Sequence, residues 1–102
     1  MSEKLTEEAF ARQLNSKFRV RADTPRPVEL ELVEVKGWRS GAAEQGGLER
    51  FSLFFSGPAD IYLPQGSYSL EHEQLGVLDI FLVPVARTPE GLRYEAVFNF
   101  FK

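Results

Sequence analysis

The sequence predicts a mainly β fold, a small antiparallel β-barrel or sandwich of about six to seven strands with one short N-terminal helix. After Ser16, apolar side chains recur at every second position, which is typical of strands with one buried face. Turn-forming glycines and prolines separate these runs at a spacing of about ten residues, as in all-β domains. No helical pattern lies between the runs, so we do not expect a parallel βαβ arrangement.

Length and composition indicate a single domain over residues 1–102 and exclude several classes of site. Hydrophobic residues make up 43% of the chain and charged residues 26%, which is ordinary for a globular domain. The net charge of -3 gives no overall attraction for nucleic acid or for an anionic membrane. The chain has no cysteine, which excludes disulfides, thiolate metal sites and cysteine nucleophiles.

The N-terminal stretch "MSEKLTEEAF" is charged and lacks the apolar segment of a signal peptide. No apolar run approaches the roughly 18 residues that a membrane-spanning helix needs. We therefore expect a protein that is cytoplasmic at synthesis and has no membrane partner.

The first element is a predicted helix over about residues 6–14. Thr6 is a suitable N-cap, and Glu7 and Glu8 lie where the helix dipole favours negative charge. Phe10 and Leu14 are one turn apart and form a narrow apolar stripe. We expect this stripe to plug one end of the barrel or to cover an open edge.

The next two strands are the alternating runs "KFRVRA" and "VELELVEV", joined by the loop "DTPRP". We expect them to pair antiparallel, with Arg21 facing Glu29. The same register places Arg19 opposite Glu31 and sets apolar side chains against each other on the other face. The alternation slips at Val33, which predicts a bulge there.

The remainder of the chain reads as a meander. The segment 36–49, "KGWRSGAAEQGGLE", is predicted to be a long mobile loop, and "RFSLFFSGP" a strand. After the short apolar stretch "DIYL" and a turn at "PQG", we expect strands at "SYSLEHE", "VLDIFLVPV" and "LRYEAVFNFF". Pro84 restricts its part of the strand to an edge or a bulge.

His72 is the only histidine and lies between Glu71 and Glu73. Neighbouring side chains of a strand point to opposite faces, so neither glutamate can orient the imidazole. With no second histidine and no cysteine, we predict no metal, no cofactor and no catalytic residue, and a structural role for His72. The alternative is a small enzyme that uses His72 with a carboxylate from another strand, such as Asp79 or Glu95.

A basic run lies near the N-terminus. It comprises Arg12, Lys17, Arg19, Arg21 and Arg26. These side chains would either contact phosphates, making the protein a single-stranded nucleic acid binder through Lys17, Arg19 and Arg21, or pair with Glu29 and Glu31 across strands. Because the aromatic residues here alternate with the basic ones instead of joining them, we favour pairing and do not expect nucleic acid as a partner.

The weak candidates for a binding surface are aromatic residues and one arginine. Trp38 and Arg39 are of types enriched at binding hot spots, although Trp38 would equally fold back onto the core. Phe54, Phe81 and Phe101 fall out of phase with the inward positions of their strands. They predict a second apolar face, covered either by the helix or by a protein partner or a further copy of the chain.

Four stretches carry a family resemblance, namely "FSLFFSGP", "LPQGSYSLEH", "FLVPV" and "YEAVFN". Over about residues 10–99 the chain resembles a bacterial family of small β-domains known only as a domain of unknown function. The resemblance implies a β-barrel-like domain and an association with proteins found alongside phage-tail-collar-like proteins. It supplies no catalytic residues. We therefore expect a non-enzymatic binding or assembly module, an accessory of a phage-tail-like or secreted particle.

Overall fold

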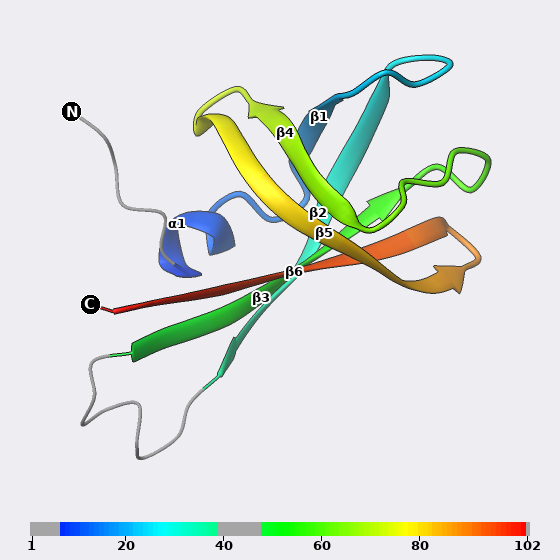
Figure 1. The fold of residues 1–102 in the computed structure, drawn as a ribbon. Helices are drawn as coiled ribbons and strands as arrows, with labels where there is room; N and C mark the ends of the chain where they lie inside the picture. Colours follow the sequence, from blue (N-terminus) through cyan, green and yellow to red (C-terminus); the bar gives the residue numbers. More distant parts are fainter. Residues whose placement is uncertain (1–6, 39–47, 102) are drawn as a thin grey trace.

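Antiparallel strands close into a barrel in the computed structural model of the protein, which describes residues 7–38 and 48–101 (Figure 1). The helix α1 spans Glu7–Ala11, and the strands are β1 (Lys17–Arg21), β2 (Val28–Trp38), β3 (Leu48–Gly57), β4 (Gly66–His72), β5 (Gly76–Thr88) and β6 (Gly91–Phe101). The strand order is β1-β2-β3-β6-β5-β4, and pairing of β1 with β4 closes the ring. The predicted mainly β fold with a short N-terminal helix is confirmed.

The inward positions of the strands form one apolar core, as the alternation of the sequence predicts. The largest fully buried side chains on the strands are Phe18, Leu30, Leu32, Phe51, Leu53, Phe55, Leu70, Leu82 and Tyr94. The "DIYL" stretch forms no strand; its Ile61 and Leu63 are nonetheless buried with the core. The amide of Leu63 donates a hydrogen bond of 3.0 Å to the Tyr94 hydroxyl, which ties this loop to the barrel.

The helix plugs the barrel with a single side chain. Phe10 is fully buried, with ring centroids 5.9 Å from Phe51 and 5.4 Å from Phe98. The helix ends at Ala11 instead of extending to residue 14, so the predicted two-residue stripe is wrong and Leu14 is 42% exposed. The reason is the turn that follows, where Asn15 takes the left-handed conformation (φ 71°) that asparagine tolerates.

The predicted register of β1 against β2 is wrong by two residues. Arg19 pairs with Glu29, and Phe18 with Leu30. A shift of two preserves the faces, so the alternation alone cannot distinguish the two registers. Pairing of β1 with β4, where Arg19 faces Glu71, is a constraint that the local pattern does not contain.

Both predicted irregularities are present. The β2–β3 register shifts between Leu32 and Glu34, and the β5–β6 register shifts between Pro84 and Ala86. The second shift lies where β5 changes neighbour: residues up to Leu82 pair with β4, and Val83 onward pairs with β6. The bulge therefore accompanies the bend that closes the barrel.

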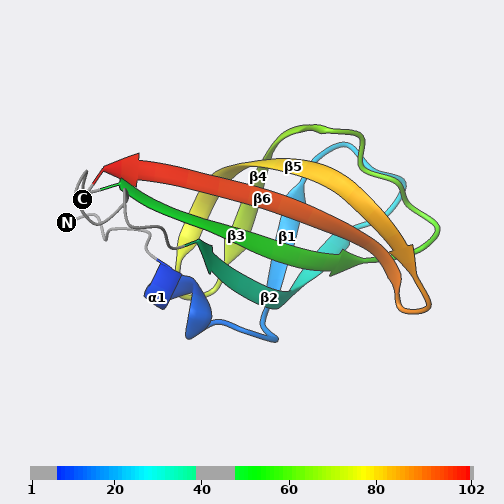
Figure 2. The ribbon, with the colours of Figure 1, turned by 90° about the horizontal axis from the view of Figure 1, so that it is seen from below.

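The predicted loop over residues 36–49 is too long at both ends. β2 continues to Trp38 and β3 begins at Leu48; residues 39–47 lie outside the described part of the chain. Gly37 is a strand residue paired with Phe51, and a β-carbon there would meet the carboxylate of Glu7 in α1. This glycine therefore permits close approach of the helix to β2, which Figure 2 shows side by side.

The strands β3 and β6 extend beyond the closed ring. They pair along their whole length, from Leu48 opposite Phe101 to Gly57 opposite Leu92. Pairing of β6 with β5 ends at Glu95 opposite Val83. The outer part of β6 therefore leaves the barrel with β3 as its neighbour, and Figure 2 shows β5 curving away from it. Within the described residues there is no helix long and apolar enough to cross a membrane.

Candidate functional site

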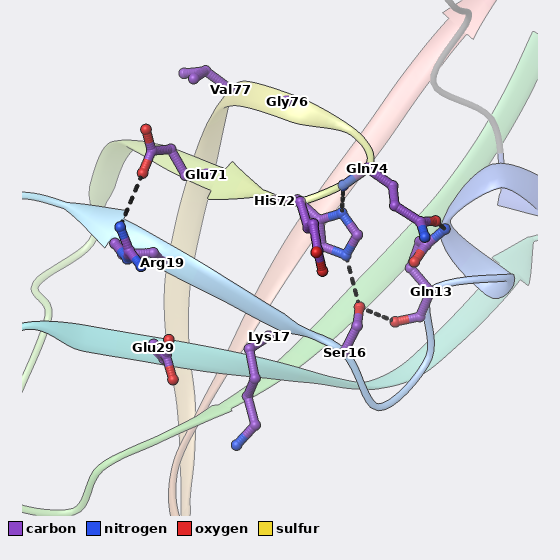
Figure 3. A pocket seen from close by; sticks show the side chains of 11 residues that line it. Gln13, Ser16, Lys17, Arg19, Glu29, Glu71, His72, Gln74, Gly76 and Val77 are labelled. Atoms are coloured by element: carbon purple, nitrogen blue, oxygen red, sulfur yellow. Dashed lines mark hydrogen bonds and ion pairs between the residues drawn. The ribbon is translucent and has the colours of Figure 1, made fainter.

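His72 ends β4 and is the centre of a hydrogen-bond network that joins two distant parts of the chain (Figure 3). Its side chain is 7% exposed, with its ring centroid 4.4 Å from that of Phe18. The Nδ1 atom accepts hydrogen bonds from the amides of Gln74 (3.0 Å) and Leu75 (3.1 Å). The Nε2 atom lies 2.9 Å from the hydroxyl of Ser16, in the segment between α1 and β1.

The directions of these bonds fix the protonation of the ring. Because two N–H groups donate to Nδ1, that atom carries no proton, and the proton of the neutral ring is on Nε2. Nε2 therefore donates to Ser16, whose hydroxyl donates in turn to the carbonyl of Gln13 at 2.6 Å. Burial lowers the pKa of His72, while the charge of Glu73 acts in the opposite direction.

A serine hydrogen-bonded to a histidine is also found in hydrolytic active sites. In this structure, however, the donor and acceptor roles of the two side chains are the reverse of those that hydrolysis requires. A general base must accept the serine proton on Nε2 while an acidic group holds a proton on Nδ1. In this structure Nε2 donates to Ser16 and Nδ1 faces two amide donors. The arrangement stabilises the turn from His72 to Gly76 and attaches it to the chain that leaves α1.

The carboxylates proposed as partners of His72 have other partners. Asp79 accepts a hydrogen bond from Ser69 at 2.6 Å, and Glu95 accepts one from Ser52 at 2.9 Å. The structure does not bring either carboxylate to the imidazole. Among residues 7–38 and 48–101, no cluster of three or more acidic or histidine side chains gathers that could hold a metal ion.

An open depression of about 680 Å³ lies over the His72 network (Figure 3). Its wall carries charges of both signs, including Lys17, Arg19 and Glu71. The guanidinium of Arg19 lies 3.6 Å from the Glu71 carboxylate, so these charges largely neutralise each other. With Glu29 and Glu73 also in the lining, the depression carries two cationic and three anionic side chains and offers no concentrated positive charge for an anion.

Every residue of the basic run lies close to a carboxylate. Nitrogen–oxygen distances are 3.0 Å for Arg12–Glu8, 3.9 Å for Lys17–Glu31, 3.6 Å for Arg19–Glu71, 4.0 Å for Arg21–Glu71 and 2.8 Å for Arg26–Asp60. The two hydrogen bonds from Arg26 hold the pKa of Asp60 below its ordinary value. The described basic side chains therefore form ion pairs with carboxylates and do not form a free phosphate-binding stripe.

The out-of-phase residues Phe54 and Phe81 lie on the outside of the barrel, on β3 and β5, together with three valines of β5 and β6. We call this set the outer apolar patch; its members are Phe54, Phe81, Val83, Val85 and Val97. Glu95 of β6 lies in register between Phe54 and Val83. The helix does not cover this face, because Phe10 is directed into the end of the barrel.

Polar groups border the outer apolar patch. The guanidinium of Arg93 lies 4.7 Å from the centre of the Phe54 ring and also binds the carboxylate of Glu34. Arginine and aromatic residues are both enriched at protein interfaces, and a guanidinium this close to a ring makes a cation–π contact. Sequence reasoning identified Phe54 and Phe81 but missed Arg93, whose side chain reaches Phe54 across the β3–β6 pair.

Three other predicted binding residues are only partly placed. Trp38 and Phe101 are the last residues of β2 and β6, and their side chains lie outside the described part of the structure, as does Arg39 altogether. Sequence reasoning missed Ser16 and Gln13 as partners of the histidine turn. No local signal indicates them, because Ser16 is 56 residues away from His72 in the chain.

The fold and the site together define a small closed antiparallel β-barrel domain that carries a histidine-capped turn and, among the described residues, exposed apolar side chains on its outer face. The chain matches the family described as Domain of unknown function (DUF6916) over residues 5–98, and it belongs to that family. The predicted resemblance to a family of unknown function is thus confirmed. No curated protein and no solved structure matches the chain.

Proposed function

We propose that this domain is a non-enzymatic binding or assembly module that contacts a partner protein through the outer apolar patch. The observation that carries this proposal is the exposure of three large apolar side chains there: Phe81 is 49% exposed, Val85 45% and Val97 54%. Large apolar side chains exposed together on one face of a small domain are typical of a site of protein association.

The surroundings of the patch support the same proposal. Arg93 and Phe54, in cation–π contact and both half-buried, offer an anchor of the residue types that dominate interface energies. The acidic Glu34 binds Arg93 at the border of the patch, and Glu95 lies within the patch, between Phe54 and Val83. A partner surface with apolar side chains, and with basic groups placed to face these two carboxylates, would complement this patch.

The place of such a module in a phage-tail-like or secreted particle remains part of the proposal and rests on the family resemblance. The alternatives, an enzyme based on His72 and a single-stranded nucleic acid binder, receive no support from the geometry. The imidazole has no carboxylate among its hydrogen-bond partners, and the basic side chains lie beside carboxylates.

The test is capture of partner proteins from the source cells by the immobilised domain, compared between two lysine substitutions. Phe81→Lys places a charge in the patch, whereas Tyr62→Lys changes an aromatic side chain that is 59% exposed in the loop between β3 and β4. We expect the wild type and Tyr62→Lys to retain the same protein and Phe81→Lys to lose it. Equal retention by all three, with folding verified by circular dichroism, would contradict the proposal.

A further inference from the structure

The outer part of β6 has an unpaired backbone edge. On one side, residues up to Phe101 pair with β3. On the other side, the ladder with β5 stops at Glu95, and no strand among the described residues pairs with β6 beyond it. In an antiparallel strand alternate residues direct their N–H and C=O groups to each side, so about half of those between Ala96 and Phe101 face this open edge.

This edge lacks the features that normally prevent strand pairing. Proteins protect exposed edges with charges, prolines, bulges or a covering helix. The run "AVFNFF" at 96–101 contains no charge, no proline and no glycine, and its register with β3 is unbroken. By contrast, the corresponding part of β2 carries Glu34 and Lys36, and α1 lies against that strand. In the part of the chain that the structure describes, the β2 edge is therefore protected against pairing with another strand, and the β6 edge is not.

We infer that the open edge of β6 pairs with the same edge of a second copy of this chain. The two β6 strands would run antiparallel about a two-fold axis. In each molecule the outer parts of β2, β3 and β6 form a three-stranded extension of the barrel, and the contact would join the two extensions into one continuous sheet. An isologous contact of this kind uses both free edges and leaves none for further growth. The occupant is thus a single second molecule, and the product is a closed dimer.

The composition of the edge favours a second copy over an unrelated strand. A residue of such a pair lies opposite its own copy only at the two-fold axis, so no axis within residues 96–101 brings Glu95 opposite Glu95 of the partner subunit, and the run itself contains no charge. An axis at Phe98 would place Val97 opposite Asn99 of the partner subunit, a combination without a charge conflict. Outward-facing Val97, which lies opposite Ser52 of β3, would then lie diagonally across the axis from Val97 of the partner subunit.

The experiment measures the molecular mass of the whole chain by sedimentation over protein concentrations up to about 1 mM, the range in which weak dimers form. We expect the wild type to reach twice the monomer mass. Val97→Lys places like charges close together across the axis and should raise the dissociation constant about tenfold or more. The matched control is Val77→Lys on β5, because Val77 is 53% exposed and Val97 is 54% exposed.

Amide hydrogen exchange supplies a second measurement that does not depend on a variant. At high concentration, alternate amides within residues 96–101 should gain protection, while the amides of β4 remain unchanged. A monomeric wild type at all concentrations, equal dimerisation of both lysine variants, or protection elsewhere would each overturn the inference. None of these outcomes decides the role of the outer apolar patch, whose test is capture of a different protein.

Discussion

At the scale of single residues, the most informative group is His72, because its contacts require one protonation state. The neutral ring accepts two amide hydrogen bonds at Nδ1 and donates one from Nε2 to Ser16. Protonation of Nδ1 would remove its acceptor site and leave two N–H groups pointing at a third. The folded protein therefore resists protonation of this ring, in agreement with the lowered pKa that its burial causes.

This linkage predicts a loss of stability in mild acid. The unfolded chain takes up a proton on His72 near the ordinary histidine pKa of about 6.5, whereas the folded chain takes it up only at lower pH. Between these two values the unfolded state binds more protons, so the free energy of unfolding falls as the pH drops. The slope for one proton is at most about 1.4 kcal/mol per pH unit.

Urea denaturation at several pH values between about 7.5 and 5 checks this prediction, since most carboxylates titrate below that range. The control is His72→Gln, which removes the titrating ring. We expect the wild type to lose stability over this range and the variant to show a flatter dependence. Parallel curves would mean that His72 titrates alike in the folded and unfolded states.

At the scale of elements, α1 depends on its contact with the barrel for its stability. A helix of five residues has no independent stability in water. Its one buried side chain, Phe10, lies against the stacked pair of Phe51 and Phe98, whose ring centroids are 5.0 Å apart. The same helix lies against β2 at Gly37. A β-carbon at this position would meet the carboxylate of Glu7, so the glycine permits the close contact.

Truncation of this plug should be costly. We expect Phe10→Ala to lower the free energy of unfolding by about 3–5 kcal/mol, because it leaves a cavity at the end of the core. The matched control is Leu14→Ala, one turn further along; Leu14 is 42% exposed and its truncation should change stability by less than about 0.5 kcal/mol. Both values come from urea denaturation, and similar effects at the two positions would show that the helix does not plug the barrel.

At the scale of the whole molecule, charge is distributed in local pairs and gives no extended field. The net charge is -3, and each residue of the basic run lies within 4.0 Å of a carboxylate. Most of these side chains are exposed, so the pairs contribute little to stability. Their effect is to remove the positive stripe that a nucleic acid would need.

We therefore predict that the domain does not retain single-stranded DNA or RNA in a gel-shift assay, even at low salt. The comparison is a variant with Lys17, Arg19 and Arg21 each changed to Glu, which should behave like the wild type. Salt-dependent retention of the oligonucleotide by the wild type, and its loss in the variant, would contradict this prediction and favour the nucleic acid alternative.

The residue pattern also shows how far sequence reasoning reaches. It predicted a bulge at Val33, which interrupts the alternation, and an edge or a bulge at Pro84, which lacks a backbone donor; the structure has a register shift at both places. It placed the β1–β2 register two residues away, because both registers satisfy the same faces. It extended the helix to Leu14, because periodicity does not reveal that the chain must turn at Asn15 to reach β1.

The sequence by itself determined which side chains face the core, since alternation along each strand is a local property of the backbone. Only the tertiary structure decided that β1 closes the ring with β4, that Ser16 lies against His72, and that β6 leaves the barrel with one edge unpaired among the described residues. These features depend on contacts between residues far apart in the chain. Closure of the barrel fixes such contacts, and no short-range pattern encodes them.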